Sequence, residues 1–221
     1  MVVNGQRFDR TVVCTRWMAP GLDVGAFLRD TVGQWLRPGD LVSISEKAVV
    51  VATGRGVPAA TVHPSRLARF VARRVRPRGN SRGLSIPEKA QLVIDTVGAW
   101  RVLLAVAAAG CTRPLGIHGA FYVVAGYVAR CMDGMRPPYH DMLLPPLPPR
   151  TARSLAQQLA MELGHAVAIV DMNDRGGSVR AVAGSVLSAR HVAAVLADNP
   201  LGQRDRGTPI VVVRQNRPLP A

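Results

Sequence analysis

The apolar run Ala166-Val-Ala-Ile-Val170 constrains the fold of this chain more than any other feature of its sequence. It follows a helical pattern over 151–163 that stops at Gly164, and it leads directly into the polar loop Asp171-Met-Asn-Asp-Arg-Gly-Gly177. A short, continuous apolar run between turn signals is typical of a buried strand. The sequence therefore predicts a strand in the core of a helix-covered sheet, with a loop beyond its carboxyl end that is suited to binding a ligand.

The remaining segments predict a mixture of helices and strands. They alternate without a strict βαβ rhythm, so we expect an α+β fold in which helices pack on a mixed β-sheet. Helices are predicted over 24–36, 63–75, 151–163 and 189–197 and from Pro87 onward, and strands over 41–44, 48–53, 166–170 and 209–213.

Two stretches leave the organisation open. Val102–Ala109 fits either a helix or a buried strand, because periodicity does not separate the two. Pro137–Pro149 contains six prolines, which predict an irregular connection without regular structure. The length of 221 residues is about one and a half times the ~150 residues typical of a domain. We therefore expect either a single domain over 1–221 or two interlocked lobes joined near 137–149.

Composition excludes several classes of protein. With 48% hydrophobic and 19% charged residues, the chain is not wholly disordered. Its three cysteines form no CxxC pair, which argues against a disulfide scaffold and a structural zinc site. The longest apolar run, 102–109, is far shorter than the ~20 residues of a membrane span, so we expect a cytoplasmic protein without a membrane anchor. GxGxxG, Walker, GxSxG and HExxH motifs are absent.

The net charge of +14 raises the question of nucleic-acid binding. Arginines are densest between Arg66 and Arg82, where Leu67, Phe70 and Val71 recur at helical spacing on the opposite side. This pattern fits a solvated helix face, which we favour, or a surface that binds an anionic substrate or RNA. No aromatic residues interleave with the arginines to stack bases, so nucleic-acid binding is disfavoured.

Acidic and amide residues gather in loops after apolar segments, at Asp133-Gly134, Asp171–Asp174 and Asp198-Asn199. Carboxylate and amide oxygens are ligands that Mg²⁺ and Mn²⁺ prefer, but the same residues also form Asx turns and helix caps. Two acids three residues apart repel each other unless a cation offsets their charge. We therefore favour a ligand role for Asp171 and Asp174.

Two further residues are candidates for contact with phosphate. Lys47, in Ser45-Glu-Lys47, is one of only two lysines and lies between two strand-like runs. Its alternative role is that of a solvated charge at a strand edge. His118 suits an acid, a base or a phosphate donor, although a lone histidine is more often a structural residue.

Taken in order, these motifs resemble the gamma-glutamyl ligases of deazaflavin coenzyme F-420, which use GTP to add glutamate to the coenzyme precursor. The resemblance covers most of the chain. It rests on Pro38-Gly-Asp-Leu-Val-Ser-Ile-Ser-Glu-Lys-Ala-Val-Val-Val-Ala-Thr-Gly-Arg55, His118-Gly119, Ala125-Gly126, Leu143-Leu-Pro145, Ala168-Ile-Val-Asp171 with Arg175, and Pro209-Ile-Val-Val-Val-Arg214.

The resemblance implies a GTP-dependent ligase that forms a homodimer and acts on a small anionic acceptor. It implies that Ser45 and Lys47 contact GTP and that Asp171 holds Mg²⁺ or Mn²⁺. The chain departs from the family at Val128, where the family has a metal-binding aspartate, and at Met172, where it has threonine. With Asp133 and Asp174 as compensating acids, the expected metal ligands are Asp171, Asp174 and Asp133, and the expected nucleotide-binding residues are Ser45, Lys47, His118, Asn173 and Arg175.

Two other functions stay open at this point. One is a protein on the same scaffold that binds a nucleotide or metal without forming an amide bond. The other is an RNA-associated protein that uses the arginines between Arg66 and Arg82.

Overall fold

The computed structural model describes residues 1–75, 82–136, 139–173, 176–185, 187–202 and 207–216. The chain divides into two compact units. Residues 1–55 and 147–221 form the first unit, and residues 56–146 form the second. The return to the first unit, between Pro146 and Leu147, falls within the proline-rich segment 137–149.

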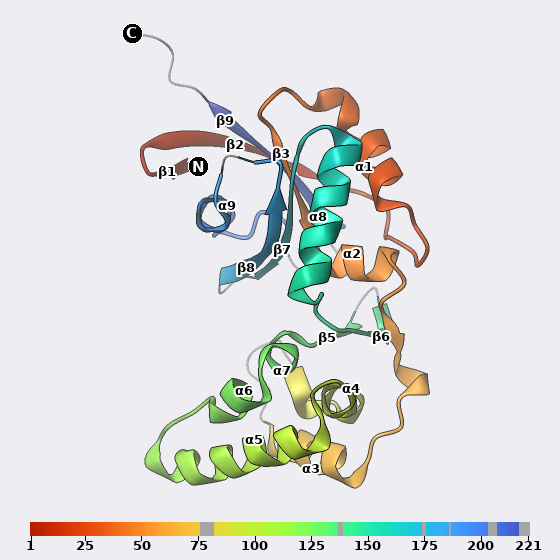
Figure 1. The fold of residues 1–221 in the computed structure, drawn as a ribbon, viewed down its shortest axis with the longest axis vertical. Coiled ribbons are helices and arrows are strands. Elements are labelled where there is room, and N and C mark those ends of the chain that lie inside the picture. The colour runs from red at the N-terminus through yellow and green to blue at the C-terminus, as the bar shows by residue number, and fades with distance from the viewer. Residues whose placement is uncertain (76–81, 137–138, 174–175, 186, 203–206, 217–221) are drawn as a thin grey trace. The chain divides into compact units, whose positions relative to one another are not determined.

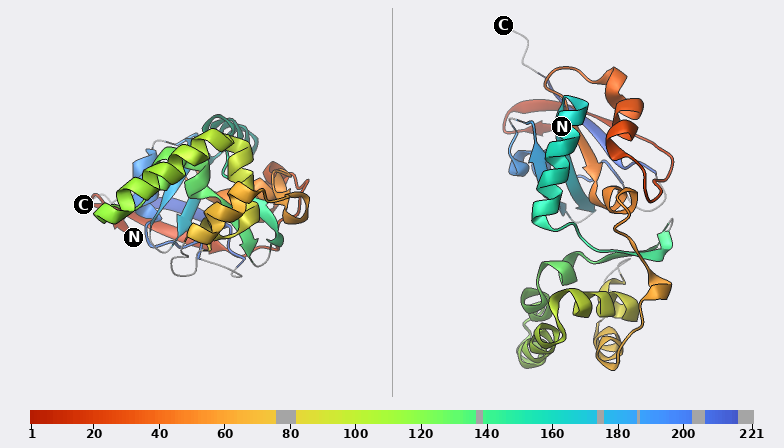
Figure 2. Two further views of the ribbon diagram at one scale, coloured as in Figure 1. Left: turned by 90° about the horizontal axis from the view of Figure 1, so that it is seen from below. Right: turned by 45° about the vertical axis from the view of Figure 1, so that its right-hand side comes forward.

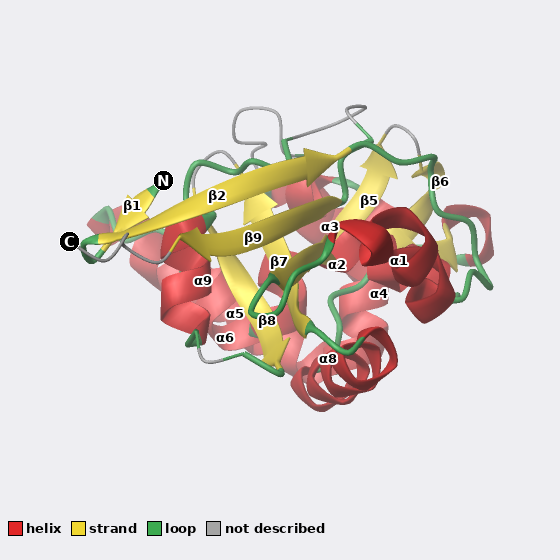
Figure 3. Ribbon diagram, turned by 90° about the horizontal axis from the view of Figure 1, so that it is seen from above, coloured by secondary structure: helices red, strands yellow, loops and turns green. Residues whose placement is uncertain are grey.

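A six-stranded sheet is the centre of the first unit (Figure 3). The fourth and fifth strands in spatial order are parallel to each other, and every other neighbouring pair is antiparallel. This mixed sheet confirms the predicted α+β class, and the strands predicted at 41–44, 166–170 and 209–213 are all present. In spatial order the strands are β1 (Val2–Val3), β2 (Gln6–Val13), β9 (Ile210–Asn216), β3 (Leu41–Ser45), β7 (Ala166–Asn173) and β8 (Gly176–Ala183).

Helices cover the two sides of this sheet (Figure 1). α9 (Ala189–Val195) buries Val192 and Val195 in a cluster with Val170 and Val211 of the sheet. α8 (Pro149–Leu163) packs against β7 and β8 from the opposite side and also contacts α1 (Val24–Val32), which continues into the 3-10 turn η1 (Gly33–Trp35). These helices match the predicted ones, except that α8 begins at Pro149, two residues before the predicted start.

One prediction in this unit is wrong. The segment 48–53 was expected to be a strand, but residues Glu46–Ala52 form helix α2. Its residues are buried almost throughout, with Lys47 the most exposed of them. A helix that is enclosed on nearly every side needs apolar residues around its whole circumference. The run Val49-Val-Val51 therefore shows no helical periodicity, and its β-branched residues are typical of a strand.

The entrance to β3 is held by an ion pair between a buried carboxylate and a partly exposed arginine. Asp40, whose side chain is 1% exposed, accepts hydrogen bonds from Arg214 Nε at 2.8 Å and Arg214 Nη2 at 2.6 Å. The backbone N–H of Arg37 donates to the same carboxylate. Burial alone would raise the pKa of Asp40, but the hydrogen bonds and charge of Arg214 outweigh it and lower the pKa below its usual 3.8. The pair therefore fastens the start of β3 to β9.

This ion pair predicts a component of acid sensitivity. Because the pKa of Asp40 is lowered by folding, its contribution to stability is present above pH 3.8 and is lost as the pH falls through the folded-state value. We expect Arg214→Gln to lower the unfolding free energy at neutral pH and to flatten its fall in acid. Chemical denaturation between neutral pH and about pH 3 measures both effects. Equal acid sensitivity in the wild type and the variant would contradict this account.

The second unit is mainly helical (Figure 2). Its core contains Ala68, Val93, Val102, Phe121 and Met132, one from each of five segments. The helices are α3 (Arg66–Arg74), α4 (Pro87–Val97), α5 (Ala99–Thr112), α6 (Ala120–Ala125) and α7 (Tyr127–Cys131), with 3-10 turns η2 (Ala59–Thr61), η3 (Gly83–Ser85) and η4 (Arg113–Leu115). A three-stranded sheet has the order β4 (Val57–Pro58), β6 (Tyr139–Leu144) and β5 (Asp133–Arg136).

The structure settles the secondary structure of Val102–Ala109 and of much of the segment 137–149, which the sequence left undecided or predicted to be irregular. Val102–Ala109 lies within helix α5. The prediction of an irregular segment over 137–149 is wrong in part, because β6 occupies Tyr139–Leu144 and α8 begins at Pro149. The prolines lie on either side of β6, so none of them removes a hydrogen bond from that strand.

Helix α3 has the amphipathic pattern that the sequence predicts, except that Phe70, which was expected on its apolar face, is exposed. Ala68, Val71 and Ala72 are buried, whereas its arginines are exposed. Among the described residues no single helix is long and apolar enough to cross a membrane; α4 together with Ala99–Leu115 meets the length and composition criteria only as a pair bent by 116°.

Candidate functional site

The parallel pairing of β3 with β7 brings their carboxyl ends to one edge of the sheet. Ser45, the last residue of β3, lies opposite Val170, so the start of α2 comes next to Asp171. Both strands are almost fully buried up to this point. Polar side chains can therefore gather only where the strands end, at Glu46, Lys47 and Asp171.

A network of four charged side chains occupies this edge. Arg180 donates from Nε to Glu46 Oε2 at 2.9 Å and from Nη2 to Asp171 Oδ2 at 2.8 Å. Lys47 Nζ lies 3.9 Å from Asp171 Oδ1. Glu46 Oε1 also accepts a hydrogen bond from the backbone N–H of Leu147 at 2.8 Å. The guanidinium of Arg180 thus bridges two carboxylates that come from different strand ends.

Arg180 reaches these carboxylates through a β-bulge. Ile169 pairs with Ala181 and Val170 pairs with Val179, so Arg180 is the extra residue opposite the two. Val179 and Val182 pack against the same core cluster although they are three residues apart, which a regular strand with a period of two does not allow. The bulge therefore inserts a charged residue into an otherwise apolar strand and directs it to the sheet edge.

Two of the four charges of this network are held away from water. The side chains of Glu46 and Arg180 are 5% and 7% exposed, whereas Asp171 is 21% and Lys47 42% exposed. Burial raises the pKa of the Glu46 carboxyl above its usual range, although the charge of Arg180 and the N–H of Leu147 oppose the shift. Lys47 is thus the member of the network that presents most surface to an incoming ligand.

The predicted residues of the first unit are distributed as follows. Lys47 and Asp171 meet as an ion pair, and Ser45 precedes them at the end of β3. Asn173 is the last residue of β7, two residues beyond Asp171. Asp174 and Arg175 lie outside the described residues.

Asp133 and His118, the other predicted site residues, belong to the second unit. Asp133 begins β5, accepts a hydrogen bond from the backbone N–H of Gly134 at 2.9 Å, and lies 4.0 Å from Lys89 Nζ. The side chain of Lys89 is only 2% exposed. Asp133 therefore lies at the start of a strand beside a buried lysine, and it does not cap a helix.

The side chains that the structure describes at this edge do not form the divalent-metal site that the family resemblance implies. No group of three or more His, Cys, Asp or Glu side chains comes together in the part of the chain that the structure describes. Both oxygens of Asp171 face a cation, Arg180 on one side and Lys47 on the other. Mg²⁺ requires several oxygen ligands in near-octahedral geometry, and this carboxylate already accepts from a guanidinium.

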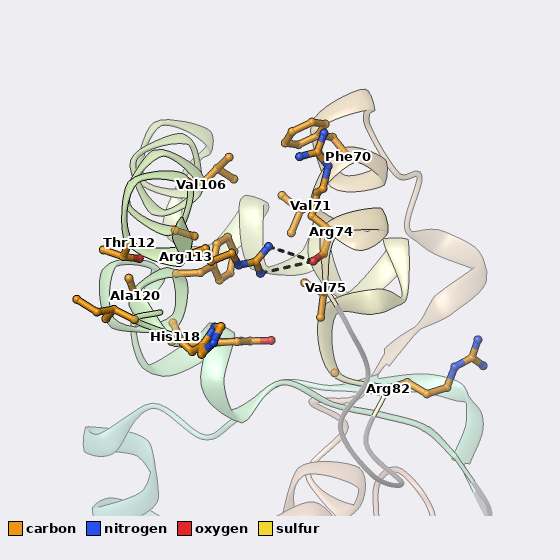
Figure 4. Close-up of a pocket in the computed structure, with 17 residues that line it drawn as sticks. Phe70, Val71, Arg74, Val75, Arg82, Val106, Thr112, Arg113, His118 and Ala120 are labelled. Atoms are coloured by element: carbon orange, nitrogen blue, oxygen red, sulfur yellow. Dashed lines mark hydrogen bonds between the residues drawn. The ribbon is translucent and has the colours of Figure 1, made fainter. Parts of the chain in front are cut away.

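The second unit contains a cavity of about 660 Å³ around His118 (Figure 4). Its walls are mainly apolar and include Val71, Val106 and Phe121. Arg113 reaches across from the turn after α5, and its two terminal nitrogens each lie 3.5 Å from the backbone oxygen of Arg74. The guanidinium of Arg74 lies 4.8 Å from the ring centre of Phe70. Arg82 is the third arginine that lines the cavity. A cavity of this size with apolar walls and three arginines suits a small amphipathic anion.

Comparison with known proteins identifies the family. The family model of F420-0:gamma-glutamyl ligase matches residues 13–189, which is most of the chain. This chain belongs to the gamma-glutamyl ligase family. The match includes the ends of β3 and β7 and the whole second unit, so both candidate sites lie within it. A search of curated proteins gave no significant match.

Glu46 and Arg180, two members of the charge network in this member of the gamma-glutamyl ligase family, were not predicted from the sequence. Glu46 stands between apolar runs, and Arg180 interrupts the strand-like segment Ser178-Val-Arg-Ala-Val-Ala183. A charged residue in a strand that packs on the core requires a partner of opposite charge. This requirement could have indicated from the sequence that Arg180 has an acidic partner, but it does not identify which glutamate or aspartate that partner is.

The network predicts a large effect on stability. Glu46→Ala leaves the buried guanidinium with one carboxylate fewer, so we expect the unfolding free energy to fall by about 3 kcal/mol. Chemical denaturation at neutral pH measures the change. Arg29→Ala is the control, because its ion pair with Glu162 is exposed and should contribute less than about 1 kcal/mol. Similar losses in the two variants would contradict a special role for the network.

Proposed function

We propose that this protein is a nucleotide-dependent amide ligase that adds glutamate, or a similar amino acid, to the carboxylate of a small anionic acceptor. Membership of the gamma-glutamyl ligase family supports the reaction class. The observation that carries the proposal is the pairing of Lys47 with Asp171 at the carboxyl ends of the two parallel strands. This is the edge of an α/β sheet at which ligands bind.

The proposed reaction has two steps. A carboxylate oxygen of the acceptor attacks the γ-phosphorus of the nucleotide, giving an acyl phosphate and the nucleoside diphosphate. The amine of glutamate then attacks the acyl carbon, inorganic phosphate leaves, and the nitrogen releases a proton as the amide forms. Cationic side chains aid the first step because they stabilise the negative charge on the transferred phosphoryl group.

We assign the nucleotide to the edge formed by Ser45, Lys47 and Asn173. Lys47 would contact a phosphate as a point charge, since its ammonium group is the most exposed charge of the network. GTP is the proposed nucleotide because the family resemblance implies it. Mg²⁺ or Mn²⁺ would enter with the phosphates of GTP, since the described carboxylates do not fit an ion of their own.

We assign the small anionic acceptor to the cavity of the second unit. Its apolar walls would contact the body of the acceptor, while Arg74 and Arg113 would attract its negative charge. His118 lies on the cavity wall and would donate a hydrogen bond to an acidic group. This assignment and the homodimer implied by the resemblance are proposals that need separate tests.

The nucleotide site is tested by Lys47→Ala. We expect the dissociation constant for GTP, measured by calorimetry, to rise at least about tenfold, because a contact with a charged group is lost. The melting temperature should change little, since Lys47 is 42% exposed. Arg37→Ala, which removes an exposed positive charge from the same unit, should leave binding unchanged.

Turnover distinguishes the ligase from the alternatives. Phosphate release that depends on both glutamate and an acceptor supports the ligase. GTP binding without amide formation would instead indicate a binding protein on this scaffold. RNA affinity that falls steeply with salt would favour the RNA-associated alternative. If GTP does not bind to the wild type, the proposed function is wrong.

The acceptor cavity is tested with anilinonaphthalene sulfonate, a fluorescent probe with an aromatic body and one negative charge. We expect Arg113→Met to weaken its binding several-fold, because the methionine keeps the apolar stem and removes the charge. Arg69→Met is the matched control: Arg69 is exposed on α3 and does not line the cavity. Equal affinity in the two variants would exclude Arg113 from the anion site.

A further inference from the structure

The charge network at the end of β3 and β7 is electrically balanced by its own side chains. Glu46 and Asp171 supply two negative charges, and Arg180 and Lys47 supply two positive charges. One guanidinium contacts both carboxylates at 2.9 Å and 2.8 Å. A cation that bridges two carboxylates is the arrangement in which proteins commonly hold a divalent ion, and here an arginine side chain takes the bridging position.

A divalent ion would have to displace this arginine. The Arg180 side chain is only 7% exposed. Removing its guanidinium from two carboxylates leaves a buried positive charge without those partners, which is a costly change. Adding two further positive charges beside Lys47 would increase the repulsion.

The second unit repeats the pattern at another predicted metal ligand. Asp133 lies 4.0 Å from the ammonium of Lys89, a side chain that is only 2% exposed. Of the three predicted metal-binding aspartates, the two that the structure describes are thus each paired with a buried cation of the chain itself.

We propose that Arg180 is a built-in replacement for a metal ion at Asp171. The guanidinium supplies the positive charge between Glu46 and Asp171 permanently, and Asp171 positions Arg180 and Lys47 instead of holding a divalent ion. The inference concerns the protein without nucleotide, and it bears on the proposed function because any ion in the reaction must then be held by other groups, such as the phosphates of GTP.

The first test is direct binding of Mn²⁺ to the full-length protein without nucleotide. Electron paramagnetic resonance of free Mn²⁺ gives a binding isotherm for the wild type and for Asp171→Asn. We expect the two isotherms to coincide, because Asp171 does not ligate the ion. Tighter binding by the wild type than by Asp171→Asn would overturn the proposal. This comparison leaves Arg180 in place and does not depend on the stability of its variants.

The second test converts the site. Arg180→Gln removes the positive charge and leaves Glu46 and Asp171 without their shared cation, so Mn²⁺ should bind at least about tenfold more tightly than to the wild type. Adding Asp171→Asn to this variant should abolish the gain, and Arg180→Lys, which restores a positive charge, should return Mn²⁺ binding to the wild-type level.

A merely structural ion pair would give a different result. Arg180→Gln would then lower the melting temperature without creating a Mn²⁺ site dependent on Asp171, and that outcome would contradict the proposal. Mn²⁺ should raise the melting temperature of Arg180→Gln but not that of Arg180→Lys, because an ion that binds only the folded state stabilises it. All these measurements are made without GTP, so failure of GTP to bind would reject the proposed function and leave this inference standing.

Discussion

The parallel pairing of β3 with β7 is the constraint on which the candidate nucleotide site depends. Antiparallel partners would send the two strands to opposite edges of the sheet, whereas parallel partners end side by side. The burial of both strands leaves no place for charged side chains along their length before Asp171. Charged residues from sequence positions more than 120 apart, such as Lys47 and Asp171, are thereby concentrated at one point.

Arg180, at the carboxyl ends of β3 and β7, determines which kind of ligand this edge of the sheet can accept. A guanidinium is fixed in charge and planar in shape, and it recognises two carboxylates through separate nitrogens. A divalent ion offers a higher charge and exchangeable positions for substrate oxygens. With Arg180 between Glu46 and Asp171, the two carboxylates are held in place by the protein, and Lys47 is the charge turned most toward solvent. In the proposed site, this arrangement favours binding of an anion over chelation of a divalent ion.

The ion pairs of the first unit that contain a buried carboxylate also define how its strands are connected. Asp40 and Arg214 join the entrance of β3 to β9, while Glu46 and Arg180 join the start of α2 to β8. Compared with apolar residues of similar size, such pairs add little net stability, because desolvation offsets their attraction. A shift of strand register, however, would leave the carboxylates of Asp40 and Glu46 buried without their partners. They favour this register over alternatives in which the apolar residues alone would pack nearly as well.

Much of the fold follows from local patterns. The strand Ala166–Val170, the amphipathic helix α3 and the helix stop at Gly164 are each encoded by a few neighbouring residues. Where the sequence pattern was ambiguous, tertiary contacts determined the secondary structure. The valines of α2 form a helix that is enclosed by the rest of the unit, and β6 forms between prolines because β4 and β5 pair with it. Local propensity is too weak to fix either choice alone.

The sequence by itself determined which residues could carry chemistry in the first unit, because Lys47 and Asp171 each follow a strand-like run that must be buried. The tertiary structure alone decided what these residues contact. Arg180 becomes the partner of Asp171 through a bulge whose position depends on pairing between β7 and β8, and Glu46 joins it from the end of a third strand. The sequence shows that a charged residue between apolar residues needs a partner of opposite charge, but only the tertiary structure shows which residue that partner is.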